Sequence, residues 1–104
     1  MGTPAGPSGT WTFLTNHSHV LICLARDPQM LMRELAELVG ITERAVQSIV
    51  ADLEAEGYVT RERVGRRNRY EVHPDQPMRH PVEGGHVVRE LLEALVSQPG
   101  VDDG

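Results

Sequence analysis

The segment between residues 32 and 72 limits the possible folds most, because its hydrophobic period changes there from that of a helix to that of a strand. Within residues 43–56, apolar side chains occupy the i, i+3, i+4 and i+7 positions of an amphipathic helix: Val46, Ile49, Val50 and Leu53. After Gly57, two β-prone runs follow at residues 58–64 and 68–72. They are separated by a short connection: Gly65, Arg66 and Arg67. The pattern predicts a helix followed directly by a β-hairpin.

Two further helices are expected before this unit. The first, at residues 17–26, follows the N-cap residue Thr15 and stops before Pro28, because proline disfavours helical geometry in the residue that precedes it. The second, at residues 32–39, ends at Gly40, which adopts the left-handed cap conformation at low cost.

The remaining segments connect or flank these elements. Residues 11–14 form a short aromatic segment that we expect to pack against the domain. Residues 29–31 are expected to form a very short strand. Residues 73–81 contain three prolines, which is typical of an extended linker. A last helix is predicted at residues 82–96.

Residues 32–53 have the features of two helices that cross at a tight turn. The residues that fit this arrangement are Ala36, Gly40, Ile41, Val46 and Ile49. Ala36 is small enough for the closest approach of the helices, and Gly40 tolerates the positive φ of the turn. The apolar members hold the second helix on the first. This is the pattern of a helix-turn-helix motif.

With the basic hairpin that follows, residues 17–72 resemble a winged helix-turn-helix transcriptional regulator of the MarR/ArsR broad class. The segment EAEGYVTRERVGRRNRYEV is similar to the end of the family's third helix, its first wing strand, its basic tip and its second wing strand. The resemblance implies an α+β fold that is mainly α, with a three-helix core, a β-hairpin wing and a C-terminal dimerisation helix.

This fold divides the chain into four parts. Residues 11–75 are expected to form the DNA-binding domain, and residues 76–96 the linker and the dimerisation helix. Residues 1–10 and 97–104 are expected to be disordered tails. The resemblance implies a homodimer that binds double-stranded DNA sequence-specifically. The single cysteine, and an N-terminus with no basic residue before an apolar stretch, predict a reducing, cytoplasmic location. Two-fold symmetry would match an inverted-repeat operator.

The charge distribution is uneven. The chain has a formal net charge of −5, yet residues 61–69 carry five Arg and one Glu, a local balance of +4. Residues 31–57 carry two Arg and six acids, a local balance of −4. A concentrated basic segment suits contact with phosphate, and a solvated surface ribbon is the alternative interpretation.

The candidate DNA contacts come from the third helix and the wing. With the apolar side chains turned inward, the opposite face presents Arg44, Gln47 and Ser48. Arginine can bond guanine bidentately and glutamine can bond adenine, while Thr42 can donate to a phosphate. The candidate wing contacts are Arg61, Arg63, Arg66, Arg67 and Arg69.

The last helix is expected to hold the dimer. Its apolar stripe consists of Val88, Leu91, Leu92 and Leu95. The first helix is expected to help through Val20, Ile22 and Leu24. The alternative is that the last helix folds back on its own domain.

Other functions have little support in the sequence. The single cysteine, Cys23, excludes an intramolecular disulfide and a multi-cysteine zinc site, and its apolar surroundings favour a packing role. His17 and His19 are two residues apart and do not match helical metal-ligand spacing. We expect no metal, no cofactor, no catalytic residues and no membrane partner, and the sequence identifies no effector.

Two alternative functions remain open. The acidic net charge supports a winged-helix module that binds protein through the same surface. The second alternative is a regulator that senses a ligand or a redox signal, through Cys23 or an interhelical pocket.

Overall fold

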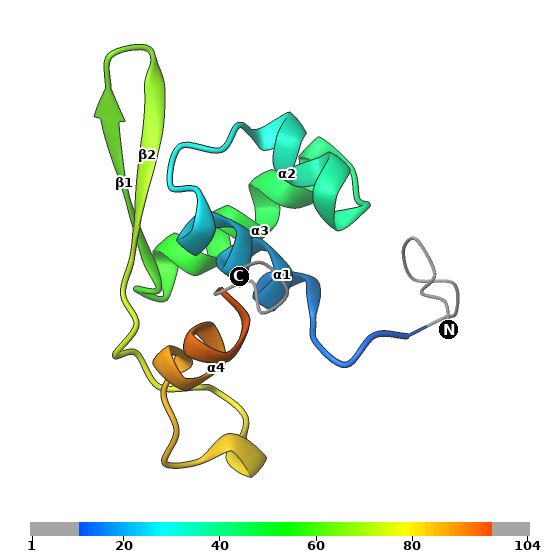
Figure 1. The fold of residues 1–104 in the computed structure, drawn as a ribbon, viewed down its shortest axis with the longest axis vertical. Helices are drawn as coiled ribbons and strands as arrows, with labels where there is room; N and C mark the ends of the chain where they lie inside the picture. The colour runs from blue at the N-terminus through cyan, green and yellow to red at the C-terminus, as the bar shows by residue number, and fades with distance from the viewer. Residues whose placement is uncertain (1–10, 97–104) are drawn as a thin grey trace, which may run out of the picture.

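The computed structural model describes residues 11–96, so both predicted tails lie outside the described residues. The elements in chain order are α1 (Asn16–Arg26), α2 (Met32–Val39), α3 (Glu43–Ala55), β1 (Val59–Val64), β2 (Arg67–Val72), the 3-10 helix η1 (Pro81–Glu83) and α4 (Val88–Leu95). The hairpin projects from the three-helix core, and η1 and α4 lie at the other end of the molecule (Figure 1). This is a winged helix with an added C-terminal helix.

Side-chain caps and a left-handed glycine set the ends of the core helices. The hydroxyl of Thr15 accepts a hydrogen bond from the backbone N–H of Ser18 at the start of α1. Thr42 accepts one from the N–H of Ala45 at the start of α3, at 3.0 Å. Gly40 ends α2 with φ of 85°. The three predicted helices are confirmed, although α1 begins one residue earlier and α3 ends one residue earlier than expected.

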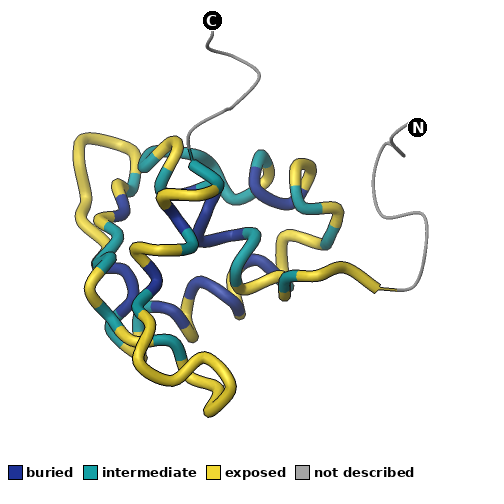
Figure 2. Tube along the Cα trace, turned by 60° about the horizontal axis from the view of Figure 1, so that its bottom comes forward, coloured by how far each residue is buried: buried dark blue, intermediate teal, exposed yellow. Residues whose placement is uncertain are grey.

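A single hydrophobic core joins the helices to the base of the hairpin. Val20, Leu24, Leu35 and Val46 have no exposed surface. Burying each such side chain stabilises the fold by about 1.5–3 kcal/mol. Tyr70 of β2 is 2% exposed and belongs to the same cluster. The buried positions follow the inner sides of the helices, whereas the hairpin is exposed beyond its base (Figure 2).

The hairpin has a shorter turn than predicted. Its strands pair antiparallel from Val59 opposite Val72 to Val64 opposite Arg67. The turn therefore contains only Gly65, with φ of 63°, and Arg66. Arg67 belongs to β2 rather than to the connection, because it pairs with Val64. This leaves Arg66 as the arginine at the tip.

The prediction of a very short strand at residues 29–31 is wrong. The backbone N–H of Tyr70 donates to the carbonyl of Pro28 at 2.9 Å, and Arg67 Nη1 donates to the carbonyl of Gln29 at 3.2 Å. The segment thus lies beside β2, but one backbone hydrogen bond does not make a ladder. The turn between α1 and α2 is attached to the wing at this point.

The helix predicted at residues 82–96 is also wrong in its first half. Gly84 and Gly85 interrupt it, and Gly85 has φ of 86°. Residues 73–87 fold back instead of extending away: Tyr58 Oη donates to the carbonyl of Pro77, and Pro77 forms a β-bridge with Val87. As a result α4 packs on α1, which is the alternative path for this helix.

The aromatic rings of residues 11–14 do not pack against the domain as expected. Trp11 is 68% exposed and Phe13 is 91% exposed. Their rings contact each other edge to face, with centroids 5.0 Å apart. Only Leu14 packs against the core. The two aromatic rings therefore stand in solvent at the start of α1.

Candidate nucleic-acid interface

One face of α3 is exposed along its first two turns. The apolar residues Val46, Ile49, Val50 and Leu53 are buried, as their spacing predicts. Arg44, Gln47 and Ser48 are exposed, and within residues 11–96 their side chains make no hydrogen bond or ion pair. Thr42 is also exposed, and its oxygen serves as the cap. The polar groups on this face are free to contact an external partner.

The wing arginines differ in how far the protein itself holds them. Arg66, at the tip, is exposed and has no partner among the described residues. Arg61 Nε lies 3.3 Å from Glu54 Oε2 on α3. Arg63 Nε donates to the carbonyl of Gly65 in the turn at 3.0 Å.

The remaining two arginines lie on β2. Arg67 is held by the carbonyl of Gln29. Arg69 lies opposite Glu62 in the register without forming an ion pair in the described part of the chain. Successive strand residues point to opposite faces. Arg67 and Arg69 therefore share one face of the hairpin, and Arg61 and Arg63 share the other.

The acids on α3 have partners that the sequence analysis did not find. His17 Nε2 lies 2.8 Å from Asp52 Oδ2, and Arg79 Nη1 lies 3.0 Å from Glu56 Oε1. With the Arg61–Glu54 pair, three acids at the C-terminal end of α3 and its cap each face a basic side chain. The first half keeps only one acid, Glu43, where it complements the helix dipole. Three of the six acids in residues 31–57 thus face a basic side chain from elsewhere in the chain.

Most of the predicted dimer residues are buried inside the protomer. The exposed fractions are 0% for Val20 and Leu24, 6% for Ile22 and Val88, and 8% for Leu92. These side chains form the core that joins α1 to α4, so the expectation that they contact a second subunit does not fit. Leu91 and Leu95 are half-buried. Of the predicted set, only these two keep surface for a partner.

Cys23 lies half-buried on α1. Burial raises the pKa of its thiol, and the charge of Arg26 offsets part of that rise. A raised pKa lowers the fraction of thiolate, which is the reactive form. Among residues 11–96, no three His, Cys, Asp or Glu side chains gather to hold a metal ion. The same residues include no helix long and apolar enough to cross a membrane.

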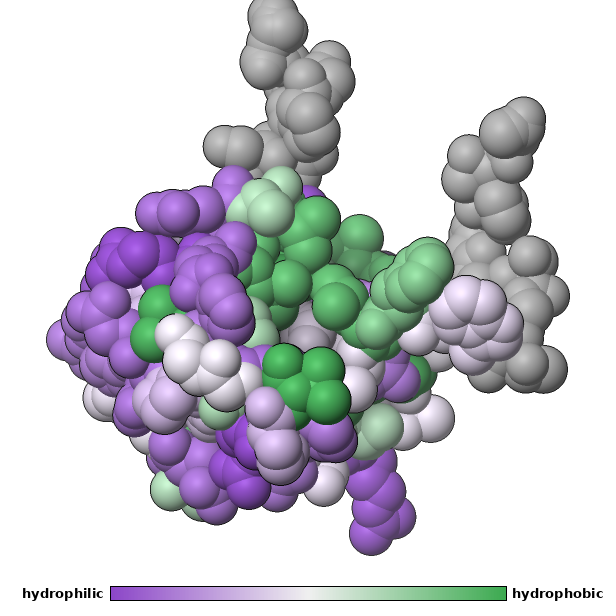
Figure 3. Space-filling view, turned by 90° about the horizontal axis from the view of Figure 1, so that it is seen from below, coloured by the Kyte–Doolittle hydropathy of each residue, from purple (hydrophilic) through white to green (hydrophobic). Residues whose placement is uncertain are grey.

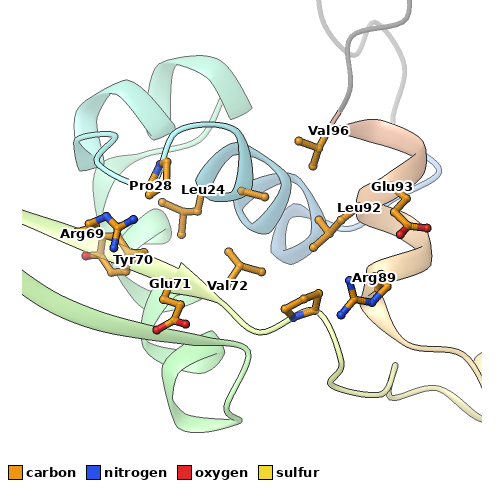
Figure 4. A pocket seen from close by; sticks show the side chains of 12 residues that line it. Leu24, Pro28, Arg69, Tyr70, Glu71, Val72, Arg89, Leu92, Glu93 and Val96 are labelled. Atoms are coloured by element: carbon orange, nitrogen blue, oxygen red, sulfur yellow. The ribbon is translucent and has the colours of Figure 1, made fainter.

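A cavity of about 680 Å³ lies behind the wing, between β2, α1 and α4. Leu24, Val72 and Leu92 point into it (Figure 4). Arg89 lines the same cavity, but its guanidinium is held by Asp75 Oδ1 at 2.6 Å. The other charged residues that line this cavity are Arg69, Glu71 and Glu93, and Arg69 forms no ion pair in the described part of the chain.

Comparison with known proteins identifies the family. No curated protein matches the chain. The sequence model of the MarR family matches residues 12–69, which is more than half of the chain and covers the three core helices and most of the hairpin. The chain therefore belongs to the MarR family of winged-helix transcriptional regulators.

Proposed function

We propose that this regulator binds double-stranded DNA sequence-specifically as a homodimer. The observation that carries the proposal is the exposed polar face of α3, where Arg44, Gln47 and Ser48 have no partner among the described residues. Arginine and glutamine side chains lose conformational entropy when they are ordered, and hydrogen bonds to base edges offset that loss. An exposed helix face of this composition, next to a basic hairpin, is suited to binding DNA.

In this proposal α3 enters the major groove, where the base edges present distinguishable patterns of donors and acceptors. Arg44 bonds a guanine and Gln47 bonds an adenine, while Ser48 contacts either kind of base. The hydroxyl proton of Thr42 remains available to donate to a phosphate, because the cap uses only the oxygen as an acceptor.

The wing contributes charge. Arg66 meets the phosphate backbone or the minor groove first, since it is at the tip and unpaired in the described part of the chain. Arg61 has to share its guanidinium between Glu54 and DNA. The positive electrostatic potential of the hairpin also includes contributions from Arg63, Arg67 and Arg69, which lie on its two faces.

The homodimer supplies the second half of the site. Two copies related by a two-fold axis present two α3 helices, which would fit half-sites about 34 Å apart, one turn of B-DNA. The expected operator is an inverted repeat.

The test selects DNA ligands from a random library and measures affinity by fluorescence anisotropy at several salt concentrations. Gln47→Ala should weaken the preferred site by about 1–3 kcal/mol and relax discrimination at one base pair. Arg66→Ala should weaken all sequences alike and reduce the log–log salt slope by about 0.9 for each protomer. Arg89→Ala, which removes an equal charge on α4, is the control and should change neither quantity.

The competing function is a protein-interaction module, which the net charge of −5 favours. It would replace our proposal if selection enriched no sequence and the wild-type protein bound DNA no better than about 10⁻⁴ M, the weak end of nonspecific binding.

A further inference from the structure

The exposed face of α3 extends beyond the three polar residues that the proposed function assigns to DNA. An α-helix has about 3.6 residues per turn, so the residues three, four and seven positions after Arg44 lie on its face of the helix. These residues are Gln47, Ser48 and Ala51, and all three are exposed. Ala51 therefore lies on the face that is proposed to enter the major groove, one turn beyond Gln47.

The acidic side chains nearest to Ala51 along α3 are held by other parts of the protein. Asp52 Oδ2 lies 2.8 Å from Nε2 of His17 on α1, and Glu54 Oε2 lies 3.3 Å from Nε of Arg61 on β1. Ala51 itself offers a methyl group and no hydrogen-bonding side chain. At this position α3 thus presents an apolar contact between two carboxylates that already have basic partners.

We propose that Ala51 recognises the C5-methyl group of a thymine in each half-site. In the major groove thymine presents this methyl group, whereas cytosine presents an N4 amino donor that needs an acceptor such as Asp or Glu. Since the carboxylates beside Ala51 are held by His17 and Arg61, the geometry favours thymine over cytosine. The inference rests on the proposed function and specifies part of the sequence that α3 reads.

The spacing along α3 places this thymine relative to the other bases. A helix rises about 1.5 Å per residue, so Ala51 lies about 10 Å along the axis from Arg44 and about 6 Å from Gln47. A base-pair step rises about 3.4 Å. When α3 lies along the groove, the thymine is about three steps from the guanine of Arg44 and about two steps from the adenine of Gln47.

The test compares operators that differ by one methyl group. Each thymidine of the selected half-site is replaced in turn by deoxyuridine, which removes only the C5-methyl group, and affinity is measured by fluorescence anisotropy. One of these replacements should weaken binding of the wild type by about 4-fold per half-site, the effect of losing one methyl group from a buried contact. Ala51→Gly should bind the thymine and uracil operators equally.

Ala55→Gly is the matched control, because it removes the same methyl group from the same helix at a similar cost in helix propensity. Ala55 is exposed, but it borders an apolar groove of about 630 Å³. This groove belongs to the end of the molecule away from the hairpin tip, where apolar side chains gather on the surface (Figure 3). Ala55→Gly should therefore keep the ratio of affinities that the wild type shows for the two operators.

Two further measurements keep the test independent of a single variant. At the same position, 5-methylcytosine should bind the wild type about 4-fold better than cytosine per half-site, and Ala51→Gly should not distinguish the two. If Ala51→Gly loses its circular dichroism signal, Ala51→Ser takes its place. Its ratio for thymine over uracil should fall towards one, because a polar hydroxyl then faces the thymine methyl group.

The outcomes separate the two proposals. Specific binding that no uracil replacement changes, or a uracil effect that persists in Ala51→Gly, overturns the role of Ala51 and leaves the proposed function standing. A selected half-site without thymine has the same consequence. A wild type for which selection enriches no sequence overturns both.

Discussion

Replacing Leu92 by alanine tests whether α4 belongs to the protomer core. Leu92 is 8% exposed, and it packs from α4 in the same cluster as the fully buried Leu24 of α1. Leucine to alanine changes in protein cores cost about 2–5 kcal/mol. We expect the lower part of that range, about 2–3 kcal/mol, because the cavity behind the wing gives the site room to relax.

The assay is urea and thermal unfolding at several protein concentrations. For a domain of this size the loss corresponds to a fall in Tm of roughly 10–20 °C. The destabilisation should persist where the protein is monomeric, since the contact lies within one chain. Leu91→Ala, on the same helix but half-buried, should cost about 1 kcal/mol or less and should weaken association instead, because Leu91 keeps exposed surface for a partner.

The opposite pattern would refute this reasoning. If Leu92→Ala left the monomer as stable as the wild type and reduced only dimerisation, then α4 would pack on a partner rather than on its own α1.

Three further predictions concern charge and the thiol. Glu54→Gln should tighten DNA binding by about 2- to 5-fold, because Arg61 is released from a surface pair; anisotropy measures it, and a weaker complex would contradict it. Cys23→Ala should cost about 1 kcal/mol of stability in urea unfolding. Anisotropy should find equal DNA affinity for the wild type and the variant in reducing and oxidising buffer, and a loss on oxidation in the wild type alone would make the thiol a sensor. The hydrogen bond from His86 lowers the pKa of Glu90, with help from the Val87 N–H. This bond stabilises the fold above the ordinary carboxyl pKa and is lost as pH falls through the lowered value. An NMR titration of His86→Ala should find the Glu90 pKa raised towards its ordinary value.

The sequence predicts the local parts of this fold well. The caps at Thr15 and Thr42, the turn at Gly40 and the apolar spacing of α3 depend on residues within a few positions of one another. The exposed face with Arg44 and Gln47 follows from the same spacing. These features need no knowledge of the rest of the chain.

Long-range contacts escape such reasoning. His17 and Asp52 are 35 residues apart, and no local pattern pairs them. The path of α4 depends on the bend at Gly85 and on the bond from Tyr58 to Pro77, which bring the chain back to α1. The spacing shows that Val88 and Leu92 lie on an apolar stripe, but periodicity does not say which chain covers it. For this reason the spacing assigns to the dimer interface side chains that are buried within the protomer.

The attachment of the hairpin has a mechanical consequence. The wing is held by Tyr70 in the core and by the backbone bond from Tyr70 to Pro28, and a side-chain bond from Arg67 to Gln29 steadies it nearer the tip. At about 3.3 Å per residue the four steps from Tyr70 to Arg66 make a lever of about 13 Å, so a rotation of about 5° at Tyr70 moves the tip by about 1 Å. The cavity behind β2 lies at the pivot. Small changes in packing between α1 and α4 are therefore amplified at Arg66.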